Sequence, residues 1–248
     1  MTQIFGHRGA RGYAPENTLE SFALAAQQKA DGIELDVQMT SDGQLVIIHD
    51  ESIDRTSDHT GLVKSFTLEQ LKQFNFNNHN PEYPLCRIPT LEEVIQLIKP
   101  TDLRINIELK NGIFVYEGIE QKVLDLVKQY EMEDRVIYSS FNHYSIVKVK
   151  QMKPDAYCGM LHEDRFIGIP EYAARYGMDA VHPALYFLID EDYVRKARQY
   201  GLEINSWTIN EPEHIWGALQ LGIEILITDY PDRAIEIRRM FEKKQVNK

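Results

Sequence analysis

Short apolar runs recur along the chain, and an amphipathic stretch of helical periodicity follows most of them. The predicted strands are Gln3–His7, Gly32–Gln38, Leu103–Lys110, Val136–Ser140, Tyr157–Leu161, Ala180–His182, Leu202–Thr208 and Ile223–Asp229. Helices are predicted near residues 17–30, 90–99, 117–130, 143–153, 170–177, 190–200, 211–221 and 231–244. Strand–helix alternation is typical of parallel strands joined by crossovers. Eight such units in 248 residues predict an α/β fold, a (β/α)8 TIM barrel, with a doubly wound open sheet as the alternative.

The apolar run Leu45–His49 does not fit this alternation, because only the sequence T-S-D-G-Q at residues 40–44 separates it from the second strand. So short a link cannot hold a parallel crossover, and the Asp-Gly within it favours a hairpin. We therefore predict that Gln44–His49 returns antiparallel to the second strand. Its His49 then lies roughly opposite Asp36, within a slip of one or two residues.

The segment from residue 51 to residue 88 is polar and irregular, with one predicted helix at Leu68–Phe74. A segment of this kind inside a barrel repeat is typical of a functional insertion at the end where the strands terminate. We predict a single catalytic domain over residues 1–248, with residues 51–88 as a small inserted subdomain that caps that end.

The composition excludes some classes of partner. A net charge of -11 disfavours sequence-independent binding to nucleic acid, although a small anionic substrate remains compatible with local basic groups. Cys86 and Cys158 have no metal-ligand spacing, which favours a reduced pair and a cytoplasmic protein. No signal sequence is recognisable, and no apolar run approaches the roughly 20 residues of a membrane span, so we expect no membrane insertion. Self-association as a homodimer is left open.

Three carboxylates are predicted to share one buried face of the sheet. Strand side chains alternate with period two, so Glu34 and Asp36 face one side of the second strand, and Glu108 faces the same side of the third with Lys110. Burying several anions is unfavourable unless something neutralises them, and one lysine is too little. Oxygen ligands favour Mg²⁺ or Ca²⁺ over zinc, so we predict one such divalent cation, against the alternative of solvated strand ends or ion pairs.

His7 and Arg8 come at the C-terminal end of the first strand, the end at which barrel active sites lie. Two histidines, His7 and His49, near a metal-bound anion can remove and donate protons, and Arg8 and Lys110 suit a phosphate. These residue types together indicate phosphoryl chemistry.

Other polar and aromatic residues carry weaker signals. Glu16 and Asn17 could bind the cation or cap the following helix, with the cap favoured for Asn17 over a ligand role and Thr18 as the other candidate cap. Trp207, with Asn205 on the same strand face, could form an apolar wall for a carbon skeleton or belong to the core. The remaining candidates are treated as structural or exposed: Cys86, Cys158, His79, His143, His162, His182 and His214.

Five motifs, in order along the chain, resemble the bacterial glycerophosphodiester phosphodiesterase family. They are H-R-G-A-R-G-Y-A-P-E-N-T-L-E-S-F at 7–22, E-L-D-V-Q-M-T-S-D-G-Q-L-V-I-I-H-D at 34–50, I-E-L-K at 107–110, W-T-I-N at 207–210 and I-T-D-Y-P at 227–231. The resemblance implies a (β/α)8 barrel with a small insertion, and metal-dependent hydrolysis of glycerophosphodiesters to sn-glycerol 3-phosphate and an alcohol.

The resemblance also implies roles for individual residues, each at a position that matches a motif. His7 and His49 would be the acid–base pair, Glu34, Asp36 and Glu108 would hold the divalent cation, Arg8 and Lys110 would contact phosphate, and Trp207 would line the glycerol side. Either the glycerol 2-hydroxyl attacks phosphorus first, giving a cyclic phosphate that water opens, or water attacks directly. The cyclic route is favoured, because two histidines can exchange roles between its steps.

Three other functions are alternatives. A lysophospholipase D would need an apolar surface around the pocket mouth, and the polar sequence N-F-N-N-H-N at 75–80 disfavours it. A binding protein without turnover is disfavoured by the presence of both histidines. A sugar isomerase would share only the barrel.

Overall fold

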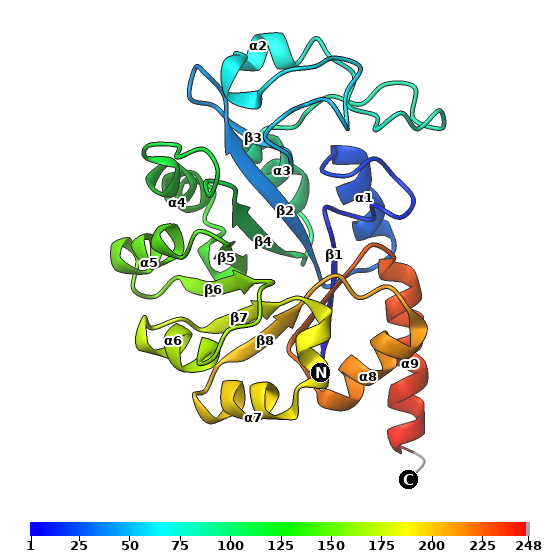
Figure 1. Cartoon of the computed structure of the whole chain (residues 1–248). Helices are drawn as coiled ribbons and strands as arrows, with labels where there is room; N and C mark the ends of the chain where they lie inside the picture. The colour runs from blue at the N-terminus through cyan, green and yellow to red at the C-terminus, as the bar shows by residue number, and fades with distance from the viewer. Residues whose placement is uncertain (247–248) are drawn as a thin grey trace.

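A computed structural model describes residues 1–246 and shows a closed barrel of parallel strands surrounded by helices (Figure 1). The barrel strands are β1 (Gln3–Gly6), β2 (Gly32–Met39), β4 (Arg104–Leu109), β5 (Val136–Ser140), β6 (Tyr157–His162), β7 (Ala180–Pro183), β8 (Glu203–Ser206) and β9 (Ile225–Thr228). Strand β1 pairs with β9 on one side and with β2 on the other, which closes the sheet. The predicted (β/α)8 barrel is confirmed, and the open sheet is excluded. Residues 247 and 248 of the predicted domain lie outside the described residues.

The helices of the barrel follow the strands in order along its outside. They are α1 (Leu19–Gln27), α3 (Leu91–Ile98), α4 (Ile119–Gln129), α5 (His143–Met152), α6 (Ile169–Arg175), α7 (Glu191–Gln199), α8 (Pro212–Leu221) and α9 (Pro231–Val246). The short helix α2 (Leu68–Leu71) lies apart from them, in the segment after β3. Short 3₁₀ helices lie at Val63–Ser65, Glu133–Arg135 and Leu185–Ile189. None of the helices within the described residues is long and apolar enough to cross a membrane.

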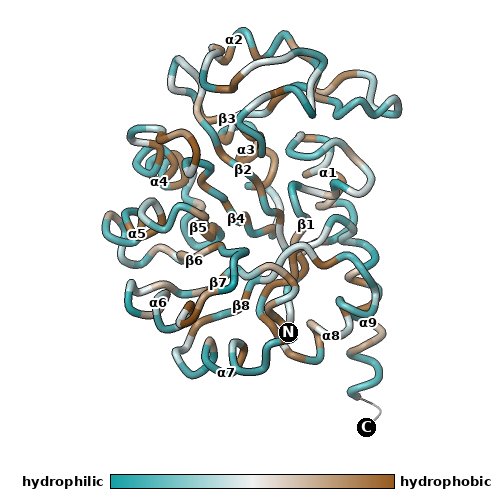
Figure 2. Tube along the Cα trace, in the orientation of Figure 1, coloured by the Kyte–Doolittle hydropathy of each residue, from teal (hydrophilic) through white to brown (hydrophobic). Residues whose placement is uncertain are grey.

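The core lies mainly between the strands and the helices. Outward side chains of β2, such as Ile33, Leu35 and Val37, are fully buried against helical residues such as Phe22 of α1 and Val94 of α3. Figure 2 shows the hydrophobic character of the strands against more polar outer helix faces. Each such side chain contributes roughly 1.5–3 kcal/mol by its burial. The opposite face of β2 is therefore left to point into the barrel, where the acidic residues lie.

The short strand β3 (Leu45–Ile47) returns antiparallel to β2, as the hairpin signal predicts. The register lies one residue from the predicted one, within the slip that the prediction allowed: Val37 pairs with Ile47, and the N–H of Ile48 donates to the carbonyl of Asp36. The difference arises in the turn, where Met39 pairs with Leu45 and all of residues 40–44 form the link. Because strand β3 ends at Ile47, the chain is free to turn His49 toward the barrel mouth.

The segment from residue 51 to residue 88 lies beside β3 at one side of the barrel, at the top of Figure 1. It has its own apolar cluster, which includes Ile53, Leu71 and Phe76 and packs on Val46 and Ile48. Of this segment, only Glu51 is among the described residues that line the main cavity. The segment thus extends one wall of the mouth.

Candidate active site

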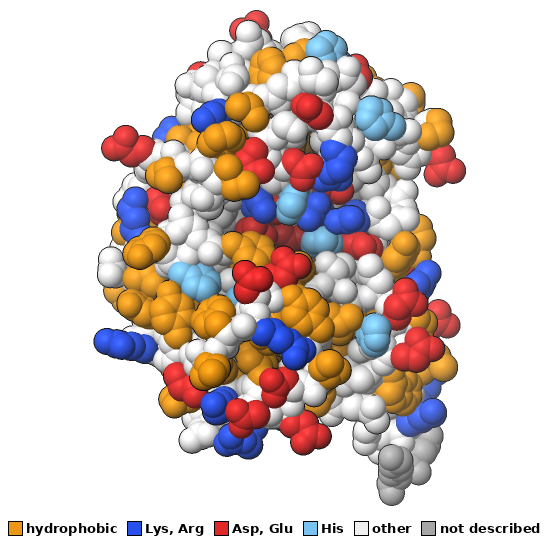
Figure 3. Space-filling view, viewed as in Figure 1, with side chains coloured by type: hydrophobic (Ala, Val, Ile, Leu, Met, Phe, Trp, Pro, Cys, Tyr) orange, Lys and Arg blue, Asp and Glu red, His pale blue; other side chains and the backbone are white. Residues whose placement is uncertain are grey.

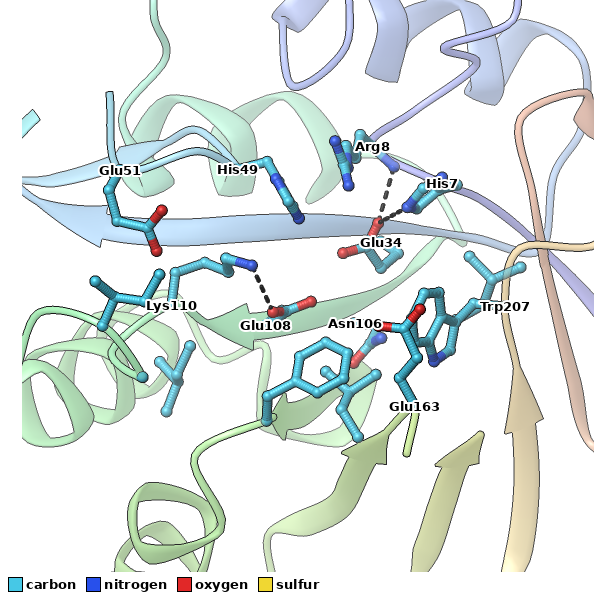
Figure 4. Close-up of a pocket in the computed structure, with 16 residues that line it drawn as sticks. His7, Arg8, Glu34, His49, Glu51, Asn106, Glu108, Lys110, Glu163 and Trp207 are labelled. Atoms are coloured by element: carbon cyan, nitrogen blue, oxygen red, sulfur yellow. Dashed lines mark hydrogen bonds and ion pairs between the residues drawn. The ribbon is translucent and has the colours of Figure 1, made fainter. Parts of the chain in front are cut away.

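A cavity of about 510 Å³ opens at the C-terminal ends of the barrel strands. Its lining residues are His7, Arg8, Glu34, His49, Glu51, Asn106, Glu108, Leu109, Lys110, Gly112, Ile113, Phe141, Leu161, Glu163, Trp207 and Ile227. Seven of the eight residues predicted for the site line this cavity, and the eighth, Asp36, is fully buried in contact with them. Figure 4 shows the lining residues converging on the cavity: His7 and Arg8 after β1, Glu34 from β2, His49 after β3, Glu108 and Lys110 from the end of β4, and Trp207 after β8.

The three carboxylates predicted to hold a cation do come together. Asp36 pairs in register with Glu108 across β2 and β4, and one oxygen from each of Glu34, Asp36 and Glu108 lies within 4.8 Å of the others. Few protein groups neutralise them: the N–H of Arg8 donates to Glu34 at 2.9 Å, and Lys110 Nζ is 3.1 Å from Glu108. Oδ1 of Asp36 is buried with no hydrogen-bond partner among the described residues.

The electrostatics of this cluster favour a further positive charge. Burial raises the pKa of Glu34 well above its usual value, and the charges of Asp36 and Glu108 raise it further. Burial also raises the pKa of Glu108, although Lys110 opposes the shift. Burial disfavours ionised Asp36 too, but its pKa is lowered overall because Arg8, His49 and Lys110 surround it. The orphaned oxygen and the mutual repulsion show that the donor set fits a hard cation.

Arg8 and Lys110 line the cavity and also form ion pairs with the buried carboxylates. Nη1 of Arg8 donates to Glu16 at 2.8 Å, and its Nε is 3.3 Å from Asp36. Lys110 is mostly buried beside Glu108. Both cations are therefore held in place before any ligand enters.

His7 is oriented by a carboxylate that comes from the other end of the chain. Its Nδ1 is 2.8 Å from Oδ1 of Asp229, which follows β9, and Asn210 donates to Oδ2 of the same carboxylate at 2.8 Å. A carboxylate only accepts hydrogen bonds, so Nδ1 of His7 carries the proton and Nε2 is left toward Glu34, at 4.0 Å. Burial lowers the pKa of His7 although Asp229 opposes the shift, so the neutral ring is favoured at neutral pH.

His49 has the same arrangement on the other side of the carboxylates. Its Nδ1 is 2.7 Å from Oδ1 of Asp50, and its ring lines the cavity. The His49 side chain is 32% exposed against 12% for His7, so His49 lies nearer the mouth. Two histidines with carboxylate-bound Nδ1 atoms thus lie beside one acidic cluster. Figure 4 shows both imidazole rings together with Glu34 and Glu108 of that cluster.

Trp207 lines the cavity, but Asn205, which was predicted on the same strand face, does not. Trp207 donates from Nε1 to the carbonyl of His182 and meets Phe141 edge to face at 5.6 Å. Asn205 is instead buried inside the barrel, with Nδ2 at 2.9 Å from Nε2 of His182. The strand alternation places both on one face, but Asn205 lies one layer deeper.

The structure also corrects the loop after β1. Thr18, not Asn17, caps α1, because its side chain accepts from the N–H of Ser21. Asn17 has a left-handed backbone, with φ 55°, that turns its amide inward, and Nδ2 donates to Asp36 at 2.8 Å. Glu16 binds Arg8 and Arg55, which leaves it no role as a cap.

Three site residues were not singled out from the sequence: Asp50, Asp229 and Arg55. A signal existed for Asp229, because it ends the last predicted strand, at the end of the barrel where His7 lies. Asp50 is adjacent to His49 in the sequence. Arg55 lies in the irregular segment, where no periodicity indicates the direction of a side chain.

Comparisons with known proteins agree on one family. The model of the Glycerophosphoryl diester phosphodiesterase family matches residues 7–233. The Glycerophosphodiester phosphodiesterase of Caldanaerobacter subterraneus subsp. tengcongensis is 41% identical over 96% of this chain and 98% of its own, and that of Bacillus altitudinis is 39% identical over 96% and 98%. The crystal structure of an Oleispira antarctica phosphodiesterase in complex with the product sn-glycerol-3-phosphate superposes with a TM-score of 0.90, at 30% identity, covering 96% of this chain and 97% of that one.

Proposed function

The chain belongs to the glycerophosphoryl diester phosphodiesterase family, and from this premise we propose that it hydrolyses glycerophosphodiesters to sn-glycerol 3-phosphate and an alcohol. The observation that carries the proposal is the pair of carboxylate-bound histidines, His7 and His49, on either side of the acidic cluster. The Oleispira relative, which contains that product, supports the choice of substrate.

We propose that Glu34, Asp36 and Glu108 hold one divalent cation, Mg²⁺ or Ca²⁺. When bound, a hard cation supplies charge neutralisation at phosphate oxygens and lowers the pKa of a coordinated hydroxyl. The protein residues around it then position the diester. Arg8 and Lys110 would donate hydrogen bonds to phosphate, and Trp207 with Phe141 would contact the glycerol carbons.

The two histidines are proposed to divide the proton transfers. Neutral His7 has a free lone pair on Nε2 inside the cavity, so it can take the proton of the attacking hydroxyl. His49 lies nearer the mouth and, as an imidazolium with its Nδ1–H on Asp50, would give its Nε2 proton to the oxygen of the departing alcohol as the P–O bond breaks. Both the attack by the glycerol 2-hydroxyl and the attack by water are compatible with this arrangement, and the cyclic route is retained as the favoured one.

A panel of glycerophosphodiesters tests the proposed activity. With Mg²⁺ or Ca²⁺ added, we expect release of sn-glycerol 3-phosphate from glycerophosphocholine, glycerophosphoethanolamine or glycerophosphoglycerol, measured by a coupled glycerol 3-phosphate assay. Detection of a cyclic phosphate by phosphorus NMR would support attack by the 2-hydroxyl. Release of glycerol with a phosphorylated alcohol, or no release from any of the diesters, would contradict the proposal.

A lysophospholipase D is a second candidate, because the mouth is apolar on the side away from residues 51–88. The loops after β4, β5 and β6 and the first turn of α5 expose hydrophobic side chains at the same end of the barrel: Ile113, Val115, Phe141, Tyr144, Phe166 and Ile167. Val115 is 82% exposed and Ile167 fully exposed. Figure 3 shows hydrophobic side chains beside the central hollow with its charged and histidine residues. Such a rim could take the acyl chain of a lysophospholipid.

Choline release from lysophosphatidylcholine tests this second candidate. In the double variant Val115→Asp/Ile167→Asp we expect choline release to fall several-fold, because the acyl chain would have to cover two charged carboxylates. Hydrolysis of glycerophosphocholine, which has no acyl chain, should stay unchanged. Met240→Asp is the matched control, since Met240 is 54% exposed on α9 and far from the loops of the mouth. Lysophosphatidylcholine that yields no choline would remove this candidate.

Three predictions from the sequence remain proposals. Residues 51–88 have their own apolar cluster, which supports an inserted subdomain within one catalytic domain. The cytoplasmic location and the homodimer rest on the sequence alone.

A further inference from the structure

Arg55, from the irregular segment after β3, lies between two carboxylates of the site. Its Nη1 and Nη2 donate to the two oxygens of Glu16 at 2.9 and 2.7 Å. On its other edge, Nε donates to Oδ2 of Asp50 at 2.7 Å and Nη2 to Oδ1 at 3.1 Å. All three guanidinium nitrogens are therefore used, in two forked contacts that only the planar shape of arginine allows.

The two carboxylates that Arg55 binds have different further partners. Asp50 binds Nδ1 of His49 at 2.7 Å, so the orientation of the imidazole depends on where that carboxylate stands. Glu16 has a buried side chain on the loop after β1, and it is also held by Nη1 of Arg8 at 2.8 Å. A continuous chain of charged contacts thus runs from the barrel through Glu16, Arg55 and Asp50 to His49.

Both carboxylates are held ionised by these contacts. Burial opposes ionisation of Glu16, but Arg55 and Arg8 outweigh it and lower its pKa to about 2. The pKa of Asp50 is lowered to about 2 as well, against the effect of burial, by Arg55 and His49. An ionised Asp50 can only accept a hydrogen bond, which fixes the proton on Nδ1 of His49 and turns Nε2 toward the cavity.

We propose that Arg55 is a positioning residue for the reaction, which anchors Asp50 to the barrel through Glu16 and thereby fixes the orientation of His49, with Nδ1–H on Asp50 and Nε2 in the cavity. Arg55 is not among the residues that line the cavity, so it acts through Asp50 and not on the substrate. His49 lies two residues beyond the end of β3, outside the strand, and its side chain is about one third exposed. Neither the strand pairing nor close packing therefore fixes the orientation of its ring. The inference rests on the role proposed above for His49.

Substitution of Arg55 tests the inference through kcat. In Arg55→Met we expect kcat for glycerophosphodiester hydrolysis to fall about 10- to 100-fold, the range seen when the partner that orients a functional histidine is lost, with KM within about threefold. Arg55→Lys keeps the charge but cannot form both bidentate contacts, so its kcat should lie between those of the wild type and Arg55→Met. Arg87→Met is the matched control, because Arg87 lies in the same segment and bonds only to the carbonyls of Gln73 and Phe74.

A double-mutant cycle separates positioning from mere support of the segment. In a His49→Ala background, Arg55→Met should change kcat by less than about threefold, because the group that it positions is gone. A full 10- to 100-fold loss in that background, or Arg55→Met with normal kcat while His49→Ala is impaired, would overturn the inference. A normal kcat in His49→Ala itself would instead contradict the role in catalysis proposed for His49. If Arg55→Met does not fold, the same cycle with Arg55→Lys decides.

Discussion

Alanine in place of His49 or His7 is expected to lower kcat for glycerophosphodiester hydrolysis by about 10²- to 10⁴-fold, the usual contribution of a general acid or base. The cause is the loss of Nε2, the ring atom that each histidine turns to the cavity while a carboxylate binds its Nδ1. KM should change much less, since neither ring is proposed to bind the diester in the ground state. Steady-state kinetics with saturating metal measure both quantities.

His59→Ala is the matched control for this experiment. Nδ1 of His59 contacts Asp58 at 2.9 Å, so it is the same kind of adjacent Asp–His pair as Asp50–His49, but its side chain is 53% exposed and lies outside the cavity. We expect normal kcat in this variant. Near-normal turnover in His49→Ala would remove His49 from the reaction, whatever the result for His7.

Removal of divalent cations is expected to abolish activity and to lower the melting temperature. A ligand that binds only the native state stabilises it by about 2.7 kcal/mol at 100 times its Kd. For a domain of this size, that corresponds to a fall of Tm by roughly 5–10 °C when a chelator is added. Readdition of Mg²⁺ or Ca²⁺ should restore both, and the metal that restores kcat identifies the cofactor. Full activity after exhaustive chelation would contradict a role for metal.

Glu34→Gln should separate the metal effect from unspecific effects of the chelator. In the metal-free protein, Glu34 must either stay charged beside Asp36 and Glu108 or take up a proton on folding, and either is unfavourable for folding. Gln avoids both, so the Tm of this variant with chelator should be higher than that of the wild type. With metal added the order should reverse, because one ligand is missing. Differential scanning fluorimetry of both proteins in both buffers measures the reversal. The same Tm order in both buffers would argue against a shared cation at Glu34.

The barrel and the acidic cluster could be predicted because each depends on local periodicity. Alternating side chains put Glu34 and Asp36 on one face of β2 and Ile33, Leu35 and Val37 on the other. In a closed barrel the apolar face packs on the helices outside, so the acidic face points inward. The resemblance to the family, stated from five motifs, is confirmed by the match over residues 7–233. The roles of the individual residues stay predictions, although the structure brings them to one cavity.

What the sequence did not predict depends on contacts between distant or irregular segments. Asp229 meets His7 across 222 positions, a contact that requires both closure of the barrel and the conformation of the β9 end. The exact register at His49 could not be predicted, because a hairpin signal leaves open the number of residues in the turn after β2. Arg55 reaches Asp50 and Glu16 from a segment without regular structure, where a side chain has no preferred direction.

The pairing of the first barrel strand with the last has a consequence for the nascent chain. During synthesis the early parts of a protein can begin to fold while the rest is still on the ribosome. Here β1 finds its neighbour β9, and His7 finds Asp229, only after the chain has been made as far as residue 229. A chain translated to an earlier point therefore lacks the group that orients His7, and catalysis should begin only after Asp229 has left the ribosome.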